Sequence, residues 1–369
     1  MAKADGVYLK LLKDIVSNGI KKIDRTNTGT VSVFGRMIRF KMEDGFPLLT
    51  TKKMFTKGII TELLWFLNGE TNIRPLVLQG NNIWVGDAYK KYCKFTESND
   101  SKWNNSMRSN PDGSYSMHTK KEFIEMIKTD ELFAKQWGEL GPIYGKQWVN
   151  WGGYEINSGE EIEGLNKGIN QIDNILDSLK NNPNSRRIMV NAWNVGDLDD
   201  MTLPPCHYGF QLYTTELSIY ERAEIARNGT PSIYKFEAED EFITGEEDTE
   251  VKKVMDVQGV PTHKLSLMWN QRSVDTFLGL PFNIASYGFL LHMIAQQVNM
   301  VPDELIGSLG DTHIYNNHIE QVKLQLTREP MELPNLVLNK ADSIDSYSLE
   351  DFEIVNYNSH PPIKGKLSN

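Results

Sequence analysis

The hydrophobic positions of this chain recur with two periods, and each period predicts a different kind of element. Apolar residues three to four positions apart predict helices over residues 7–18, 59–67, 169–179, 284–298 and 319–326. Gly19 follows the first as an expected C-cap, and Asn181-Asn182-Pro183 ends the third. The second is almost wholly apolar yet contains Glu62, a carboxylate that is costly to bury unless it is paired or used.

Alternation with a period of two predicts strands. It begins near Val31 and continues to Phe40, and it recurs over residues 187–193. The segments 211–213 and 265–267 are expected to form the two arms of a hairpin. Helices packed on a mostly antiparallel or mixed sheet make α+β the expected fold class.

Composition and charge limit the classes of function. Of the 369 residues, 40% are hydrophobic and 24% are charged, which is ordinary for a globular protein. The net charge of −10 argues against sequence-independent binding of nucleic acid, because no general basic surface remains for phosphates. A local basic pocket is still compatible with this charge, and its candidates are Arg25, Arg186, Arg187 and Arg272.

The cysteine content indicates a reducing environment. Only Cys93 and Cys206 are present, which gives neither a disulfide framework nor a CxxC metal signature, and we expect no metal. The N-terminus has no apolar signal stretch, and no run is long enough to span a membrane. We therefore expect a cytoplasmic protein, in the host cytoplasm if the source is a virus.

Cys206 is the strongest candidate for chemistry. It lies in Leu203-Pro204-Pro205-Cys206-His207, about twenty residues after the adjacent pair Arg186 and Arg187. A thiolate is the reactive form of cysteine, and nearby cations favour it. The two prolines fix φ twice, so the thiol would sit on a stiff corner. Taken alone, one cysteine after a proline pair is more often a small buried hydrophobe, but the surrounding motifs favour the nucleophile.

These motifs together resemble the thymidylate synthase family. The resemblance runs from about Tyr8 to Lys366 and is carried by blocks that occur in the family's order: Asp24-Arg25-Thr26, Phe46-Pro47-Leu48-Leu49-Thr50-Thr51-Lys52, Glu62-Leu63-Leu64-Trp65-Phe66-Leu67, Gly141-Pro142-Ile143-Tyr144-Gly145-Lys146-Gln147-Trp148, Ser185-Arg186-Arg187, Leu203-Pro204-Pro205-Cys206-His207, Gln271-Arg272-Ser273, Gly279-Leu280-Pro281-Phe282-Asn283-Ile284-Ala285-Ser286-Tyr287 and Gly310-Asp311-Thr312-His313-Ile314-Tyr315.

Two segments interrupt the resemblance. Residues from Asp87 to about Trp137 are rich in turn signals. Residues from Glu221 to about His263 carry an acidic run between positions 237 and 250, which favours a solvated loop or a small appended subdomain, with a partner-docking surface as the alternative. No repeat or linker divides the chain, so we expect residues 1–369 to form a single thymidylate synthase-like catalytic domain with these two insertions.

The resemblance implies a chemistry. Addition of the Cys206 thiolate to C6 of a pyrimidine nucleotide makes C5 nucleophilic, so that one difficult step becomes several easier ones. The family's one-carbon donor is 5,10-methylenetetrahydrofolate. Carried over, Glu62 and Tyr144 handle protons, and His207 orders water unless it is only a satisfied core histidine. Lys52, Trp84 and Asp275 map to the folate side, as contacts to its tail charge, its stacking wall and its pterin.

The resemblance also implies how the nucleotide is bound. Phosphate needs planar, bidentate donors, and the family's phosphate residues correspond to Arg25, Arg186, Arg187, Arg272 and Ser273. In the family the adjacent arginines reach across a two-fold axis into the neighbouring subunit, which implies a homodimer. The remaining nucleotide residues are His313 and Tyr315 at the sugar 3′-hydroxyl and Gln211 near the nucleotide.

Asn283 carries the expectation for the base. It matches the family residue that hydrogen-bonds O4 and N3 of uracil, and an amide offers the donor and the acceptor that uracil requires. A relative that acts on cytosine has Asp here, so Asn283 favours dUMP over dCMP. The alternative is an asparagine that caps the following helix, and the two roles are compatible.

Departures from the family pattern bear on the product. The usual second tryptophan after Trp84 is missing from Val85-Gly86-Asp87, Asn27 replaces a glycine, Asn270 replaces a tyrosine, and the chain ends in Lys366-Leu367-Ser368-Asn369 instead of an apolar pair. Loss of an aromatic wall and a polar lid favour water beside the folate. We therefore favour dUMP hydroxymethylation, with tetrahydrofolate as the second product, over methylation to dTMP with dihydrofolate. Neutral drift in a divergent synthase is the competing explanation.

A further alternative is an inactive homologue that binds a partner such as RNA. The complete set of Cys206, Asn283, Arg272, Tyr144 and Glu62 argues against loss of catalysis, and the acidic charge argues against nucleic acid.

Overall fold

A six-stranded mixed sheet organises the chain. The computed structural model describes residues 3–24, 27–97, 103, 106–153, 168–229 and 246–367. The strands lie in the order β1 (Ile20–Lys22), β2 (Thr30–Lys41), β8 (Val301–Tyr315), β7 (His263–Asp275), β6 (His207–Glu216) and β5 (Met189–Asn191). β7 and β8 are parallel, and the other neighbours are antiparallel. The prediction of an α+β fold with a mixed sheet is confirmed.

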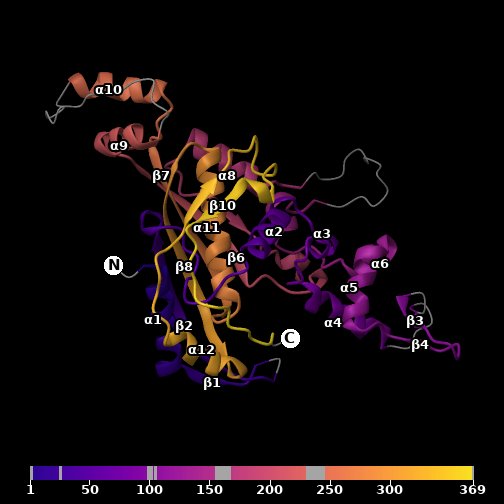
Figure 1. The fold of residues 1–369 in the computed structure, drawn as a ribbon. Helices are drawn as coiled ribbons and strands as arrows, with labels where there is room; N and C mark the ends of the chain where they lie inside the picture. Colours follow the sequence, from indigo (N-terminus) through magenta and orange to yellow (C-terminus); the bar gives the residue numbers. More distant parts are fainter. Residues whose placement is uncertain are drawn as a thin grey trace, which may run out of the picture.

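Helices cover one face of the sheet. α11 (Gly279–Gln297) packs against β7 and β8, where side chains such as Leu267 and Trp269 are fully buried. The remaining α-helices are α1 (Ala4–Asn18), α2 (Thr56–Leu67), α3 (Arg74–Leu78), α4 (Val85–Thr96), α5 (Lys120–Thr129), α6 (Glu131–Trp137), α7 (Tyr144–Val149), α8 (Gln171–Asn181), α9 (Ile219–Gly229), α10 (Glu246–Val257) and α12 (Ile319–Leu326). Figure 1 shows α4, α5 and α6 extending to one side, away from the strands.

The predicted helices are all present, as α1, α2, α8, α11 and α12. Gly19 ends α1, but its φ of −71° is not left-handed. A Cβ there would lie 2.4 Å from the Ile15 carbonyl oxygen and 2.5 Å from a Val31 methyl group. Glycine is therefore required by the close approach of α1 to β2 and not by its freedom at positive φ.

The predicted strands are also present, with one difference in length. β2 covers the first, and β6 and β7 pair as the expected hairpin arms, with Leu212 opposite Leu267. The strand expected over residues 187–193 is limited to β5. Its end has a local cause, because the Trp193 backbone N–H donates to the Asn191 side chain and turns the chain out of the sheet.

The segment 87–137 is more regular than its turn-rich composition predicts. It contains most of α4, a short hairpin of β3 (Arg108–Ser109) and β4 (Tyr115–Ser116), and α5 and α6. Its aromatic side chains pack around Tyr92, which is fully buried and lies 5.1 Å from the Trp137 ring, centroid to centroid. These side chains join the same hydrophobic cluster as the rest of the core.

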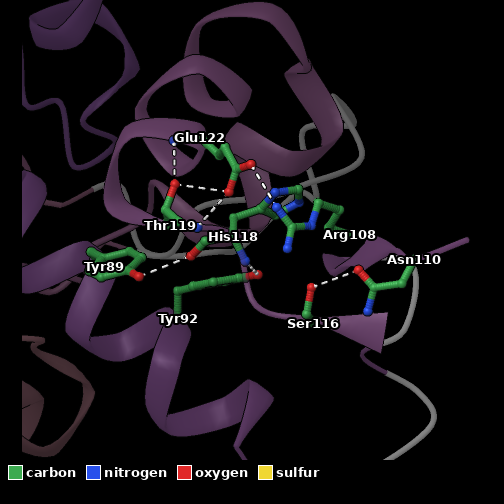
Figure 2. Close-up of polar contacts among 8 residues, drawn as sticks. All are labelled: Tyr89, Tyr92, Arg108, Asn110, Ser116, His118, Thr119 and Glu122. Atoms are coloured by element: carbon green, nitrogen blue, oxygen red, sulfur yellow. Dashed lines mark hydrogen bonds and ion pairs between the residues drawn. The ribbon is translucent and has the colours of Figure 1, made fainter. Parts of the chain in front are cut away.

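Polar contacts tie this segment together, as Figure 2 shows. The Tyr89 hydroxyl donates to the His118 carbonyl (2.9 Å), and the His118 N–H donates to the Tyr92 hydroxyl (3.0 Å). Thr119 and Glu122 form a capping box that starts α5. The turn signals therefore mark connections between short helices that tertiary contacts stabilise.

The second interruption contains α9 and α10, which lie beyond the first residues of β7 in Figure 1. The buried Arg222 guanidinium joins them, because it pairs with Asp256 at 2.6 Å and donates to the Pro261 carbonyl. The acidic positions 237–241 lie outside the described residues. A small helical subdomain agrees with one of the two forms expected for this segment.

We expect Asp5→Asn to lower the free energy of unfolding by about 2–4 kcal/mol, the scale for losing charge-assisted hydrogen bonds in a buried site. The fully buried Asp5 carboxylate accepts from the backbone N–H and hydroxyl groups of Thr50 and Thr51, at 2.7 to 3.1 Å. An amide would turn N–H donors toward these donors. Urea unfolding measures the change. Asp14→Asn, which loses an ion pair to Arg36 that is partly exposed, is the control and should cost less than about 1 kcal/mol.

Within the described ranges, no helix is both long and apolar enough to cross a membrane.

Candidate active site

Several of the candidate residues meet at one edge of the sheet. β6 starts directly after Cys206, and the parallel strands β7 and β8 end at the same edge, at Asp275 and Tyr315. The chain before β2 also reaches it, because Thr30 pairs with Tyr315. The sequence blocks, which are far apart along the chain, therefore come together where these strands start and end.

Arg272 holds the corner that carries Cys206. Its Nε donates to the Pro205 carbonyl (2.9 Å) and its Nη2 to the Pro204 carbonyl (3.0 Å), while its backbone N–H donates to the Cys206 carbonyl (2.8 Å). The guanidinium lies 5.1 Å from the centre of the Trp193 ring. Neither proline can donate a hydrogen bond itself, so Arg272 supplies the polar contacts that fix the corner.

Buried aromatic residues line the other side of Cys206. The Cys206 N–H donates to the Tyr144 hydroxyl at 2.8 Å, and the Tyr144 ring lies 4.4 Å from the His207 ring. Nδ1 of His207 and the Tyr287 hydroxyl are 2.8 Å apart. Burial raises the pKa of Tyr144 well above its ordinary value, so its hydroxyl keeps its proton at neutral pH.

Burial also lowers the pKa of His207 to about 3. The imidazole is therefore neutral at physiological pH and is engaged by Tyr287. This geometry agrees with a satisfied, buried histidine. The role of His207 in ordering water stays a prediction.

Glu62 is buried and paired with Trp84. The Trp84 indole N–H donates to a carboxylate oxygen of Glu62 at 2.8 Å, and the Trp84 ring lies 5.9 Å from the Tyr144 ring. Burial raises the pKa of Glu62 to about 7, and the bond from Trp84 opposes that rise. A carboxyl group that titrates near neutral pH suits proton transfer.

Asn283 lies inside α11, so the alternative that it caps this helix is wrong. The helix starts at Gly279 with Leu278 as the N-cap. The Asn283 side-chain oxygen accepts from the Gln271 amide (3.1 Å), and Gln271 accepts in turn from the Trp269 indole (3.1 Å). This chain of bonds fixes which end of the Asn283 amide is the oxygen and leaves its NH₂ group directed elsewhere.

Asp275 and Lys52 both bond to the backbone of the residues that directly precede α11. The Asp275 carboxylate accepts from the backbone N–H groups of Phe277 and Leu278, both at 3.1 Å. The Lys52 amine is buried and donates to the Phe277 carbonyl, and burial lowers its pKa to about 7 against the opposing effect of Asp275. In this position Lys52 does not reach the surface, as a contact with a charged folate tail requires. Trp84 is also buried, with its indole bonded to Glu62, so the folate contacts expected of Trp84 and Asp275 stay predictions.

His313, Tyr315 and Ser273 lie on the ends of the parallel strands. Asp275 pairs with His313, and the rings of His313 and Tyr315 are 5.1 Å apart, edge to face. The Ser273 carbonyl accepts from Gln271. The Asn316 N–H donates to the Gly29 carbonyl at 2.9 Å, which brings the preceding loop to the same edge. Arg25, on that loop, lies outside the described residues.

Arg186, Arg187 and Gln211 are not brought to Cys206. Both arginines are exposed just before β5, and the Arg186 carbonyl accepts weakly from Gln211. The pairing of Met189 with Gln211 places Arg187 level with Tyr213, seven residues along β6 from Cys206. At about 3.3 Å per residue this is about 20 Å, beyond the reach of an arginine side chain.

Two supporting residues carried no predicted role. Gln271 orients Asn283, and Tyr287 engages His207. Both lie in motif blocks that marked the site, and that position was the available signal. Among the described residues, no group of three or more His, Cys, Asp or Glu side chains is arranged to hold a metal ion.

The chain is similar to known proteins over nearly its whole length. The family model described as thymidylate synthase matches residues 6–231 and 248–369, and so runs unbroken through 87–137. Proteins named thymidylate synthase from Mycoplasma mobile and Mycoplasma genitalium are 42% and 40% identical over 362 and 361 residues. One from Listeria monocytogenes is 39% identical over 369 residues, and each alignment covers 98% of this chain and 99% of the relative.

Proposed function

The chain belongs to the thymidylate synthase family, and from that premise we propose that it converts dUMP to dTMP with 5,10-methylenetetrahydrofolate as co-substrate. The observation that carries the proposal is the environment of Cys206. The Arg272 guanidinium holds the corner on one side of this thiol and the buried Tyr144 hydroxyl contacts its backbone on the other. An inactive binding protein would have no need for this arrangement.

The residues of the chain divide the work by their chemistry. Cys206 adds to C6 of the uracil ring, and the Arg272 guanidinium favours the thiolate and binds the phosphate. Asn283, oriented by Gln271, pairs with O4 and N3 of the base. Tyr144 and Glu62 move the proton of C5, since both are buried beside the nucleophile's corner. His313, Tyr315, Ser273 and Arg25 complete the contacts to sugar and phosphate.

The folate supplies the one-carbon unit and, in methylation, the hydride. Trp84 and Asp275 would hold its ring system, because the family resemblance assigns them the stacking wall and the contact to the pterin. Lys52 stabilises this region by donating a hydrogen bond to the Phe277 carbonyl.

Two departures from the family pattern, at Asn27 and after Trp84, support hydroxymethylation less than the sequence alone suggested. Asn27 has φ of +57°, the left-handed conformation for which glycine and asparagine are the favoured residues, so it replaces glycine without changing the backbone. Trp84 is buried against Trp65 and Tyr144 and bonded to Glu62, so the wall stands without a second tryptophan. The names of the relatives also favour the methyl product.

Hydroxymethylation, the product favoured by sequence, is not confirmed and stays the second candidate. Its remaining support is Asn270 in place of a tyrosine and the polar end of the chain, of which Ser368 and Asn369 lie outside the described residues. One incubation with dUMP and methylenetetrahydrofolate separates the candidates. Dihydrofolate absorbance with a methyl mass gain supports methylation. A hydroxymethyl mass gain without dihydrofolate contradicts it, and no turnover of either kind contradicts both.

We expect Trp84→Phe to move the acidic limb of the pH profile of kcat/KM to higher pH. The Trp84 indole stabilises the ionised form of Glu62, so its removal raises a pKa that burial has already raised to about 7. With the carboxylate as proton acceptor, activity below neutral pH then falls by a further factor of about three or more. Trp65→Phe is the control, because that indole donates to the Asn72 carbonyl. An unmoved limb in Trp84→Phe would separate Glu62 from the proton transfer.

A homodimer is part of the proposal. Arg186 and Arg187 lie too far along the sheet for their own Cys206, so a second copy must receive them if they bind phosphate. One face of the sheet also exposes large apolar residues, among them Met37, Met189 and Tyr213, which the strand register places on the same side. A two-fold contact through this face would bury them and exchange the arginines.

We expect two inactive variants to restore each other. Cys206→Ala and the double variant Arg186→Ala with Arg187→Ala each lack one half of every site. In a mixed dimer, one of the two sites combines an intact Cys206 with intact arginines. An equal mixture after subunit exchange should recover about one quarter of wild-type activity, since about half of the dimers are mixed. No recovery in demonstrably mixed dimers would assign both arginines to their own subunit or to neither.

A cytoplasmic setting fits the proposed chemistry, because a nucleophilic thiol at Cys206 must stay reduced.

A further inference from the structure

The last part of the chain forms a strap that returns to the active-site edge. After β10 (Phe352–Val355), residues 357–367 run without helix or strand. The His360 N–H donates to the Thr50 carbonyl (2.8 Å), and the Arg328 guanidinium donates to the Pro361 carbonyl (2.6 Å). These bonds fix the first half of the strap, around His360 and Pro361, to the loop that carries Lys52. We call this part the near half and the part around Gly365 and Lys366 the far half.

His318 fixes the far half. Its Nε2 lies 2.8 Å from the Lys366 carbonyl oxygen. A carbonyl can only accept, so Nε2 carries the proton of this bond and Nδ1 has the lone pair. The ring is fully buried, and its Nδ1 has no hydrogen-bond partner among the described residues. A residue needed only for packing would avoid a buried nitrogen without a partner, which points to the Lys366 bond as the reason for histidine.

Gly365 presses the strap onto the start of α11. A Cβ at this position would lie 3.0 Å from a Phe277 ring carbon, 3.1 Å from the Leu278 side chain and 3.1 Å from Nε2 of His318. The absence of a side chain therefore allows the close approach that the His318 bond needs.

His318 also lies between the two halves of the site. Its ring is 5.1 Å from the Phe277 ring and 6.0 Å from the Tyr315 ring. Phe277 follows Asp275 and accepts from Lys52, on the folate side, and Tyr315 belongs to the nucleotide side. A movement of the strap, of Phe277 or of Tyr315 would therefore change the contacts of the His318 ring.

We propose that His318 is a positioning residue that clamps the C-terminal strap, through the Lys366 carbonyl, against the folate side of the active site. The inference rests on the proposed function. His318 touches neither the base nor the nucleophile, and it acts by setting how firmly strap residues 357–367 are held against Phe277 and Leu278, at the start of α11. Its loss should weaken the use of methylenetetrahydrofolate and spare the binding of dUMP.

The test compares substitutions that keep and remove the donor. His318→Phe keeps a ring against Phe277 and loses the N–H, whereas His318→Gln restores an N–H donor at the place of Nε2. We expect His318→Phe to raise the KM for methylenetetrahydrofolate about fivefold to tenfold, the scale of one net hydrogen bond, with the dissociation constant of dUMP within about twofold. Backbone amides of the strap should exchange with deuterium faster by a similar factor. His318→Gln should recover most of both effects.

Further variants make the outcome decisive. Gly365→Val should reproduce both effects without touching His318, and so keeps the test valid if His318→Phe fails to fold. His360→Phe is the matched control, because this histidine donates to the Glu329 carbonyl at the near half of the strap. Unchanged exchange and folate KM in His318→Phe would overturn the proposal, as would equal effects in His360→Phe. Amide exchange needs no turnover, so it still tests His318 if the wild-type protein proves inactive on dUMP.

Discussion

Replacing Cys206 with serine lowers turnover of dUMP by about 10⁴-fold or more, the scale for removing a nucleophile. The contacts that fix this corner run through the backbone, from the Cys206 N–H to Tyr144 and from Arg272 to the carbonyls of residues 204–206, and serine keeps all of them. The loss therefore reports the thiolate alone. A hydroxyl in this place lacks an activating base, because a pKa of about 3 makes the His207 imidazole a weak base and Tyr287 engages its Nδ1. Steady-state assays measure the decrease.

A covalent adduct gives the second measurement. With 5-fluoro-dUMP and the folate, fluorine at C5 cannot leave as a proton does, so the wild-type protein should gain the mass of the adduct and Cys206→Ser should not. Cys93→Ser is the control, since Cys93 is the other cysteine of the chain and lies on α4. Adduct formation in Cys206→Ser, or activity within about tenfold of wild type, would remove Cys206 from the mechanism.

Local periodicity predicted the elements that carry the sheet and its covering helices. α12 has the predicted bounds, and α1, α8 and α11 differ from their predictions by a few residues at their ends. In these segments the apolar stripe belongs to one helix, so a window of sequence contains the signal.

The segment 87–137 could not be predicted in the same way. α5 and α6 are short, with 10 and 7 residues, and short helices are marginal without tertiary packing. Their stability comes from the cluster around Tyr92, whose partners Phe123, Phe133 and Trp137 lie 31 to 45 positions further along the chain. The turns between these helices have a local sequence signal. The aromatic contacts that stabilise the helices join residues far apart along the chain and have no such signal.

The identities of the site residues came from motif blocks, but their partners came from the fold. The bond from Trp84 to Glu62 crosses 22 positions, and that between His207 and Tyr287 crosses 80. Such pairs depend on which strand ends lie at the same edge of the sheet. A local sequence pattern does not predict this arrangement. The same holds for Arg187, whose position level with Tyr213 follows from strand register alone.

In the proposed function, the preference for dUMP over dCMP depends on the direction of the Asn283 amide. Gln271 donates to the Asn283 oxygen, so the Asn283 NH₂ group is free to donate to O4 of uracil while the oxygen also accepts from N3–H. Cytosine reverses both groups, because it has a donor at position 4 and an acceptor at N3. A site built around Asn283 therefore leaves buried polar groups unpaired when cytosine binds.

Asn283→Asp should change the ratio of kcat/KM for dUMP to that for dCMP by about 10³-fold or more in favour of dCMP, on the scale by which hydrogen-bonding sites reject a mismatched partner. One carboxyl oxygen keeps the bond from Gln271, and the other accepts from the cytosine amine or, when protonated, donates to N3. Competition between the two nucleotides, read by product mass, gives the ratio directly. Gln271→Leu should weaken discrimination without reversing it, because Asn283 then loses the bond that orients its amide. A ratio in Asn283→Asp that equals the wild-type ratio would mean that Asn283 does not face the base, and the assignment of dUMP would then need another residue to carry it.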